Sequence, residues 1–369
     1  MKLVKAPKKM LKKGGRVLYD ANQIVRLVTD PTRSRSYYPS EPRKSKVNVL
    51  TDLLMWWIRH GEVNTNYYLY GFDRRHPENV DQYIPYRTFR RMRDQRNQHP
   101  KSANGYTYAC LLRDKFIFSQ LLSSLKIPTP KNVALYDQGM ITWLDSMQTV
   151  PLEQILEMRD VQLDLFCKPL TGIGGTGAFP LTLRDGRLFV NHEAIGIGQL
   201  KERLSIPYLI QEQIRQHPQL NALYPHAINT IRLITFNNNG RVEVFSGGFR
   251  TGTQGRPVDN WAVGGVSVGI DLKTGRLCAE GFMKPGYGGR VLRHPDTGIL
   301  FAGFQMPYFQ EAMDLVCRLH QYFYGLHSIG WDICITETGP LIIEGNDDWG
   351  ILMVHEQRFK DKFLAMYQA

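Results

Sequence analysis

The chain has 369 residues, a net charge of +12, and hydrophobic residues at 43% of its positions. It is too long for one average domain and apolar enough to form packed cores, so two or three globular units are expected. It has no run of about 18 apolar residues, which predicts no membrane span. The basic N-terminal segment lacks the apolar stretch of a secretory signal, so we expect a cytoplasmic protein.

The cysteines lie far apart, without metal-binding or redox spacing, at Cys110, Cys167, Cys278, Cys317 and Cys334. This pattern predicts buried thiols in a reducing compartment.

Much of the positive charge lies before residue 101. The clusters are Lys8, Lys9, Lys12, Lys13, Arg87, Arg90, Arg91, Arg93 and Arg96. A basic face attracts polyanions such as nucleic acid, anionic lipid headgroups or an acidic substrate, although it can also be a solvated helix face. No zinc-finger spacing, ribonucleoprotein motif or basic zipper accompanies the charge, which argues against nucleic acid as the partner.

In chain order, residues 1–44 predict an extended or loosely helical arm, and residues 46–61 a helix that ends at Gly61. Residues 62–100 predict short helical pieces. Apolar residues at helical spacing then predict one amphipathic helix over 108–125.

After residue 130 strands dominate. Strands are predicted at 133–136, 163–168, 207–213, 263–271 and 276–282, with two further strands within 228–250 around the turn 237–240 and a hairpin over 181–190. Helices are predicted at 152–158, at 307–324 and at the C-terminus. Antiparallel strand pairs with interspersed helices predict an α+β fold.

The most informative stretch is Gly330–Ile333 followed by Pro340–Asn346, two apolar runs joined by a turn. Asp332 and Glu344 are expected on neighbouring strands, and Glu344 and Asn346 on one face of a strand. Three oxygen donors on one face would suit Mg²⁺, with Mn²⁺ as the second choice, beside nucleotide phosphates. A hairpin with solvated polar tips is the alternative, although a glutamate within an Ile-rich run is costly to bury without a partner.

The glycine-rich segment 171–177 contains a formal G-x-G-x-x-G pattern. A dinucleotide-binding loop must open a helix, whereas this segment leads to Pro180 and a hairpin, so we reject that interpretation. A loop between two strands instead predicts a lid whose backbone amides cover phosphates, which Lys168 could also reach. A flexible surface loop is the alternative. The P-loop pattern and the catalytic motifs of protein kinases are missing from the sequence.

The order of these elements resembles the ATP-grasp enzymes, and within them the sugar-transfer-associated family, which is α-L-glutamate ligase-like. The resemblance rests on Lys115, Lys168, the segment 211–214 and the trio Asp332, Glu344 and Asn346. Segments 229–235 and 258–265 look like further elements of that family. The resemblance covers roughly residues 45–355.

The resemblance implies an ATP-grasp fold, with two α+β subdomains that sandwich ATP after a basic, mostly helical N-terminal region. The expected segments are 1–100, 101–215 and 216–369, the last two being the lid-bearing and metal-binding subdomains. The implied ATP contacts are Lys115 and Lys168 at the phosphates, the lid residues Gly172, Gly174, Gly175, Thr176 and Gly177, and Gln211, Glu212, Gln213 and Ile214 at the adenine. The implied Mg²⁺ ligands are Asp332, Glu344 and Asn346. Near the γ-phosphate and an acyl-phosphate the resemblance implies Arg232, Arg250 and Asn260. The implied catalytic residues are Arg232, Arg250 and Lys168.

The sequence departs from the family pattern in two places. Gly330 stands where many such ligases carry an arginine, so Arg250 or Arg256 is expected to hold the tetrahedral intermediate. No clear ribose-binding acid follows the adenine segment, and His217, Gln219 and Asn221 are weak candidates.

The resulting hypothesis is an ATP- and Mg²⁺-dependent carboxylate–amine ligase that acts through an acyl-phosphate. Its substrate would be an acidic sugar, an amino acid or a glycan-linked anion. The basic region could gather that anion, or could meet an anionic membrane surface on the cytoplasmic side. Two alternatives remain, an ATP-dependent phosphotransferase and a non-catalytic module that binds nucleotides or polyanions. The sequence leaves the oligomeric state open.

Overall fold

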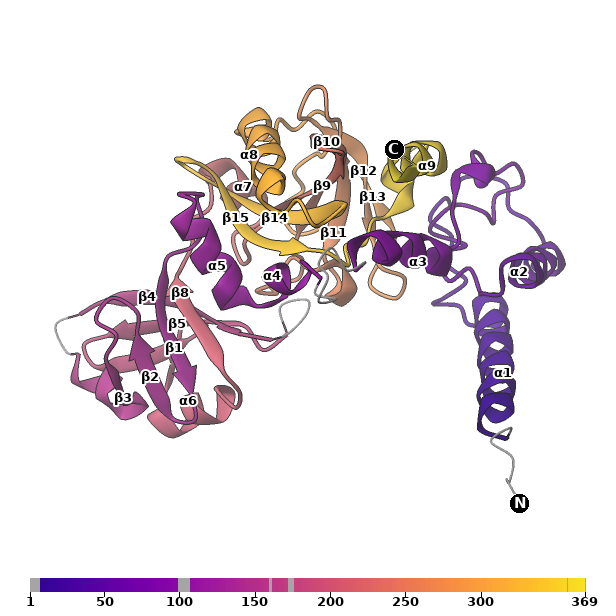
Figure 1. The fold of residues 1–369 in the computed structure, drawn as a ribbon. Coiled ribbons are helices and arrows are strands. Elements are labelled where there is room, and N and C mark those ends of the chain that lie inside the picture. The colour runs from indigo at the N-terminus through magenta and orange to yellow at the C-terminus, as the bar shows by residue number, and fades with distance from the viewer. Residues whose placement is uncertain (1–6, 99–106, 159–160, 172–175, 357, 369) are drawn as a thin grey trace, which may run out of the picture. The chain divides into compact units, whose positions relative to one another are not determined.

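The structure is a computed structural model that describes residues 7–98, 107–158, 161–171, 176–356 and 358–368 (Figure 1). The chain divides into two compact units. One comprises residues 1–93, 282–291 and 351–369, and the other comprises residues 94–281 and 292–350. This division does not test the boundaries expected after residues 100 and 215, which stay predictions.

The first unit is mainly helical, which confirms the expected character of the N-terminal region. Its helices are α1 (Pro7–Thr29), α2 (Lys46–His60), η1 (Val80–Gln82), most of α3 (Tyr86–Asn97), η4 (Met353–His355) and α9 (Phe359–Gln368). The loosely helical arm expected before residue 45 is wrong for residues 7–29, which form one continuous helix. In α2 the Ser45 side chain accepts a hydrogen bond from the Asn48 amide, and Gly61 ends the helix with a positive φ of 69°. Both are common helix-end signals.

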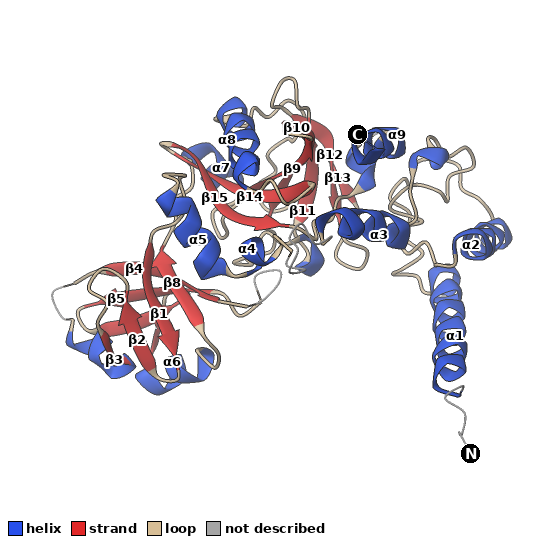
Figure 2. Ribbon diagram, viewed as in Figure 1, coloured by secondary structure: helices blue, strands red, loops and turns tan. Residues whose placement is uncertain are grey.

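The second unit begins with a sheet of eight antiparallel strands in the order β3-β2-β1-β8-β4-β5-β6-β7 (Figure 2). The elements are β1 (Asn132–Asp137), β2 (Met140–Trp143), β3 (Thr149–Pro151), η2 (Leu152–Glu157), β4 (Leu163–Pro169), β5 (Phe179–Arg184), β6 (Arg187–Val190), β7 (Glu193–Ile195), α6 (Ile197–Arg203) and β8 (Tyr208–Glu212). Leu165, Leu181 and Ile210 are among the buried side chains of its core. This sheet positions Lys168, on β4, and Gln211, on β8.

A second sheet has the strand order β13-β12-β11-β10-β9-β14-β15. Its elements are α7 (Pro218–Leu223), β9 (Thr230–Asn238), β10 (Arg241–Thr251), η3 (Trp261–Val263), β11 (Val266–Ile270), β12 (Leu277–Met283), β13 (Arg290–Val291), α8 (Phe309–Tyr322), β14 (Ser328–Thr336) and β15 (Gly339–Asn346). The pairs that involve β9, β10, β14 and β15 are antiparallel. Helix α8 buries Ala312, Leu315 and Leu319 as it packs against this sheet. Two antiparallel sheets with interspersed helices confirm the α+β class.

The single helix predicted over 108–125 is wrong, because the structure breaks it into α4 (Cys110–Arg113) and α5 (Lys115–Ser124). Asp114 between them has extended backbone angles, and its carboxylate accepts a hydrogen bond from the Ile117 amide. An aspartate that caps a following helix is a strong start signal, which the apolar spacing concealed. The break makes Lys115 the first residue of α5.

The cysteines are free, but the expectation that all are buried is wrong. Cys167 and Cys334 are buried, Cys317 is partly buried, and Cys110 and Cys278 are exposed.

His320 on α8 is buried and neutral. The Leu326 carbonyl, 3.2 Å from Nε2, can only accept a hydrogen bond, so Nε2 carries the proton and Nδ1 accepts from the Thr235 hydroxyl at 2.7 Å. Burial lowers the pKa of His320 to about 4. The unfolded chain therefore binds a proton near pH 6.5 that the folded chain takes up only near pH 4, so stability falls as the pH drops through this window.

We expect this histidine alone to lower the free energy of unfolding by about 2 kcal/mol between pH 7 and pH 5. Urea unfolding at both pH values, on the wild type and on His320→Gln, measures the difference. The variant should lose less stability than the wild type over this interval. An equal loss in both proteins would show that His320 does not titrate as its burial implies.

Candidate functional site

Asp332, Glu344 and Asn346 lie together on β14 and β15, as predicted. Asp332 is directly opposite Glu344 in the strand register. The Asn346 side-chain amide donates to Glu344 Oε1 at 3.3 Å and lies 3.5 Å from Asp332 Oδ2. The three side chains therefore converge on one face of the sheet, while their role as metal ligands stays a prediction.

Two arginines from the neighbouring strands β9 and β10 face the same carboxylate. Arg232 forms a bidentate pair with Asp332, with Nε–Oδ1 at 2.5 Å and Nη2–Oδ2 at 2.7 Å. Arg250 Nη1 lies 3.4 Å from Asp332 Oδ1. The side chains of Arg232 and Arg250 are 12% and 23% exposed, so a solvent-facing arginine pair is excluded.

The two carboxyl groups have opposite electrostatic environments. Burial alone would raise the pKa of Asp332, but Arg232 and Arg250 outweigh it and hold that pKa below its ordinary value. Burial, and then the neighbouring Asp332 carboxylate, raise the pKa of Glu344. Glu344 is therefore the member of the pair that gains most from an added cation.

The donor set fits Mg²⁺, which takes carboxylate and amide oxygens. No group of three or more His, Cys, Asp or Glu side chains suited to a metal occurs among the described residues. A third protein ligand at this pair would thus be of another kind, and Asn346 offers an amide oxygen. Its amide nitrogen faces the carboxylates, so ligation requires the amide to turn over. Both oxygens of Asp332 are held by Arg232, so this arginine competes with a metal for that carboxylate.

Lys115 and Lys168 lie within electrostatic range of Glu344, which favours the charged form of each amine. Lys168 is on β4 and only 9% exposed, so it is a buried lysine and not an exposed charge at the edge of the glycine-rich loop. Burial lowers the pKa of Lys168 to about 8 and also lowers the pKa of Lys115. One buried and one half-buried amine near a carboxylate cluster suit the binding of a polyphosphate.

The glycine-rich segment connects β4 to β5, and Thr176 and Gly177 precede β5 as expected. Gly172, Gly174 and Gly175 lie outside the described residues. Gly177 has a positive φ of 79°, and its carbonyl accepts a hydrogen bond from the Tyr208 hydroxyl at 3.0 Å. A loop between paired strands agrees with the rejection of a dinucleotide fold, while its role as a lid stays a prediction.

The segment predicted at the adenine lies at the end of β8. Gln211 is buried and donates to Asn132 Oδ1 at 2.7 Å, whereas Glu212 is exposed and pairs with Lys131 at 2.7 Å. The backbone amides of Glu212 and Gln213 already donate within the protein, to Lys131 and Asp164. An adenine at this segment would thus have to meet other groups, such as the backbone of Ile214, and the contact stays a prediction.

Asn260 caps η3, because its side chain accepts a hydrogen bond from the Ala262 amide at 2.8 Å. Its neighbour Asp259 was not among the predicted site residues, and its carboxylate accepts a hydrogen bond of 2.5 Å from the Thr230 hydroxyl. Burial raises the pKa of Asp259 to about 6, although Arg250 opposes the shift. Its position next to Asn260, a predicted site residue, was the sequence signal that could have identified Asp259. A carboxyl group with a raised pKa suits a proton acceptor near neutral pH.

The structure explains why a glycine stands at position 330. A Cβ atom added to Gly330 would lie 2.5 Å from the Trp349 Cβ and 3.3 Å from Arg232 Nη1. An arginine at this position would overlap the tryptophan, so the departure from the family pattern follows from packing. The expected substitutes differ in position, since Arg250 contacts Asp332 while the Arg256 guanidinium donates to the Val263 carbonyl.

We expect Gly330→Ala to lower the free energy of unfolding by about 1–3 kcal/mol through overpacking. Gly198 on α6 is the matched control, because a Cβ atom there meets no atom within 4 Å. Gly198→Ala should be neutral or stabilising, since alanine favours the helix. Urea unfolding measures both variants, and equal stability of the two would contradict the packing argument.

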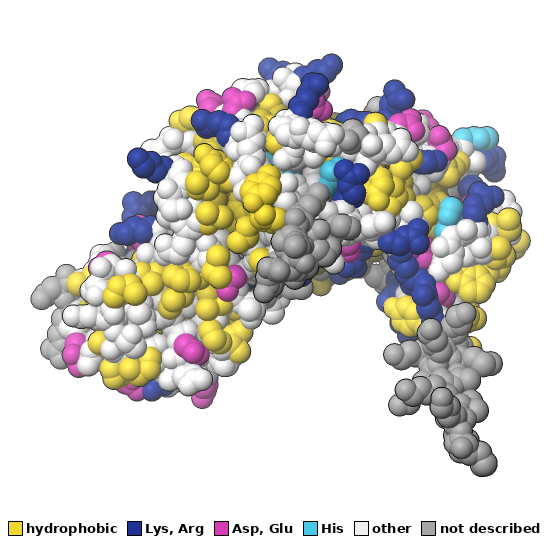
Figure 3. Space-filling view, viewed as in Figure 1, with side chains coloured by type: hydrophobic (Ala, Val, Ile, Leu, Met, Phe, Trp, Pro, Cys, Tyr) yellow, Lys and Arg dark blue, Asp and Glu magenta, His cyan; other side chains and the backbone are white. Residues whose placement is uncertain are grey.

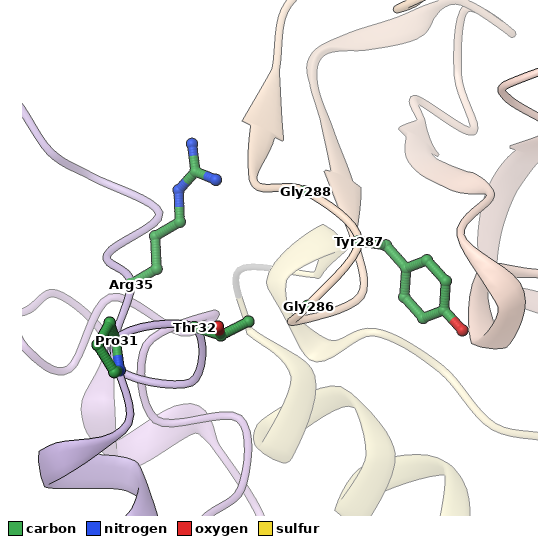
Figure 4. A pocket seen from close by; sticks show the side chains of 6 residues that line it. All are labelled: Pro31, Thr32, Arg35, Gly286, Tyr287 and Gly288. Atoms are coloured by element: carbon green, nitrogen blue, oxygen red, sulfur yellow. The ribbon is translucent and has the colours of Figure 1, made fainter.

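A cavity of about 310 Å³ lies in the first unit (Figure 4). It is lined by Pro31, Thr32, Arg35, Gly286, Tyr287 and Gly288. Arg35 comes from the segment after α1, and the glycines come from the loop before β13. None of the predicted site residues lines it.

Residues 94–358 match the family described as sugar-transfer associated ATP-grasp. No curated protein sequence is significantly similar to this chain. Among solved structures, D-alanyl-alanine synthetase A from Vibrio cholerae aligns with 11% identity and a TM-score of 0.39, over 71% of this chain and 65% of that one. The D-alanine–D-alanine ligase from Bacillus anthracis aligns with 12% identity and a TM-score of 0.37, over 71% of this chain and 69% of that one. N5-carboxyaminoimidazole ribonucleotide synthetase from Thermotoga maritima aligns with 12% identity and a TM-score of 0.37, over 73% of this chain and 51% of that one.

The chain therefore spans less than two thirds of the length of two of these three structures. Similarity at this level carries no argument about activity. The match of residues 94–358 to the family is what identifies the chain.

Proposed function

Because this chain belongs to the sugar-transfer-associated ATP-grasp family, we propose that it is an ATP- and Mg²⁺-dependent ligase that joins a carboxylate to an amine. The observation that carries the proposal is the convergence of Asp332, Glu344 and Asn346 beside Arg232 and Arg250. Lys115, which is half-buried, and Lys168, which is buried, lie within electrostatic range of Glu344 and add two amines to this cluster.

These side chains suit phosphoryl transfer, which depends mainly on positioning and on neutralising charge. Lys115 and Lys168 would hold the phosphates of ATP, and Arg232 and Arg250 would face the transferred phosphoryl group. Glu344, Asn346 and Asp332 would hold Mg²⁺. When bound, the ion would neutralise charge on the phosphate oxygens.

In the proposed reaction an oxygen of the substrate carboxylate attacks the γ-phosphorus, ADP leaves, and an acyl-phosphate forms. The amine then attacks the acyl carbon, phosphate leaves, and the amine loses a proton as the amide forms. We assign the uptake of that proton to Asp259, which lies near Arg250 and whose pKa is raised by burial to about 6. Preorganised cations beside a developing negative charge can supply several kcal/mol of transition-state stabilisation.

We propose an acidic sugar, an amino acid or a glycan-linked anion as the acyl donor. The support is the arginine pair at the site, because guanidinium groups bind carboxylates through paired hydrogen bonds. The family description, which associates these proteins with sugar transfer, points the same way.

The test is a screen of carboxylates and amines for Mg²⁺-dependent ATP consumption, followed by mass analysis of the products. A ligase releases ADP and free phosphate and forms an amide that lacks one water. ADP with a phosphorylated acceptor would instead identify a phosphotransferase. AMP with diphosphate would contradict the proposal, and ATP binding without turnover over a broad panel would favour the non-catalytic module.

A further inference from the structure

The net positive charge of the chain comes entirely from its first unit. Residues 1–93, 282–291 and 351–369 contain 25 Lys and Arg and 10 Asp and Glu, which gives a net charge of +15. The second unit contains 21 Lys and Arg and 24 Asp and Glu, which gives a net charge of −3. Most of the first unit also lies outside residues 94–358, the part that matches the family. The source of the basic character is thus separate from the candidate site.

Helix α2 in this unit is apolar on two opposite faces. Val49 and Leu53 are buried, at 4% and 0% exposure. The opposite face exposes Val47, Leu50, Leu54 and Ile58, which recur every three or four residues and so form one stripe along the helix. Val47 and Ile58 are 71% and 69% exposed.

We call the four residues Val47, Leu50, Leu54 and Ile58 the α2 stripe. Monomeric soluble proteins seldom leave such a row of large apolar side chains in water. Figure 3 shows hydrophobic side chains gathered at the surface over α2, with Lys and Arg side chains near them. The stripe therefore needs a partner.

We propose that the α2 stripe docks onto an anionic lipid bilayer. Lys46 and Arg59 are exposed at the two ends of α2, where their charged heads can reach lipid phosphates while the stripe enters the acyl boundary. An amphipathic helix with an apolar face and basic flanks lies in the plane of the interface, and anionic headgroups strengthen its binding. No helix within the described residues is long and apolar enough to cross a membrane, so the contact is peripheral.

Charge decides between a bilayer and the other candidate occupants. A second copy of the chain would bring another unit of net charge +15 against the first, and the two would repel. Nucleic acid complements the charge, but its phosphates give no reason for a row of Val, Leu and Ile side chains. A bilayer with anionic headgroups satisfies both the charge and the apolar stripe.

The test uses the full chain in co-sedimentation with phosphatidylcholine vesicles that contain phosphatidylglycerol, and with vesicles of phosphatidylcholine alone. The chain should bind the anionic vesicles more tightly, and added salt should weaken that binding. Ile58→Glu should reduce the affinity about tenfold or more, because it replaces an apolar side chain that the bilayer would bury with a negative charge. The matched control is Ile206→Glu, at a position in the other unit that is 44% exposed.

Several results would overturn the proposal. They are a lack of binding to anionic vesicles, equal binding to neutral ones, or an equal effect of the two substitutions. A dimer in light scattering that Ile58→Glu dissociates would assign the stripe to a second copy instead. A fall in affinity for a duplex oligonucleotide on Ile58→Glu, with vesicle binding unchanged, would assign it to nucleic acid. None of these measurements depends on ATP, so they stand or fall separately from the proposed ligase activity.

Discussion

Asp332→Asn should lower the free energy of unfolding by about 3–5 kcal/mol. The substitution keeps the size of the side chain but leaves Arg232, whose side chain is 12% exposed, without its bidentate counter-charge. Removing one partner of a buried ion pair is costly because the other charge stays desolvated. Urea unfolding at pH 7 measures the loss, and a second substitution, Arg232→Met, should recover part of it.

Asp347→Asn is the matched control for this prediction. Asp347 is also buried and also forms a bidentate pair, with Arg113 at 3.0 and 2.8 Å. The Arg113 side chain is 56% exposed, however, so water can replace the lost carboxylate and the loss should be about 1 kcal/mol or less. Equal destabilisation by the two aspartate substitutions would contradict the idea that Asp332 is the main counter-charge of Arg232 in a desolvated site.

Lys168→Met should reduce the kcat for ATP turnover by about 10²–10³, because it removes a fixed positive charge from the proposed phosphate site. The fold should be retained. The folded chain disfavours the lysine charge, since burial lowers the pKa of Lys168 to about 8. A lysine with a lowered pKa destabilises the folded chain below that pKa, and the effect disappears as the pH rises above 10.5. Methionine, of similar length and uncharged, should therefore give equal or higher stability at pH 7.

The exposed Lys273 provides the control, because Lys273→Met changes the same charge on a turn before β12. It should leave both turnover and urea stability within error of the wild type. Loss of activity together with a large loss of stability in Lys168→Met would show that the lysine supports the fold and does not act in the site.

Periodicity and turn residues were sufficient to predict most of the fold. The hairpin of β5 and β6, the pair β14 and β15, and the helices α2 and α8 follow from alternation or from helical spacing. The break at Asp114 did not, because an aspartate cap interrupts an apolar pattern that continues on both sides. The continuous α1 was also underestimated, because the lysines and the Gly14-Gly15 pair in its first half concealed the helical apolar spacing of its second half.

Some features of the candidate site could likewise be predicted from the sequence, and others could not. Asp332, Glu344 and Asn346 could be predicted to converge, since adjacent strands place residues of known register side by side. The bidentate ion pair between Arg232 and Asp332 and the burial of Lys168 could not be predicted, since both depend on how strands far apart in the sequence pack. The constraint at Gly330 depends on Trp349, 19 positions later, and only coordinates reveal such a contact.

A crystal structure with Mn²⁺ and a non-hydrolysable ATP analogue tests the central claim most directly, because the anomalous signal of manganese locates the ion. We predict a peak within ligand distance of Glu344 and Asn346, with the triphosphate extending toward Lys115 and Lys168. A nucleotide bound elsewhere, for example at the Arg35 cavity, or a manganese peak away from β14 and β15, would contradict the account.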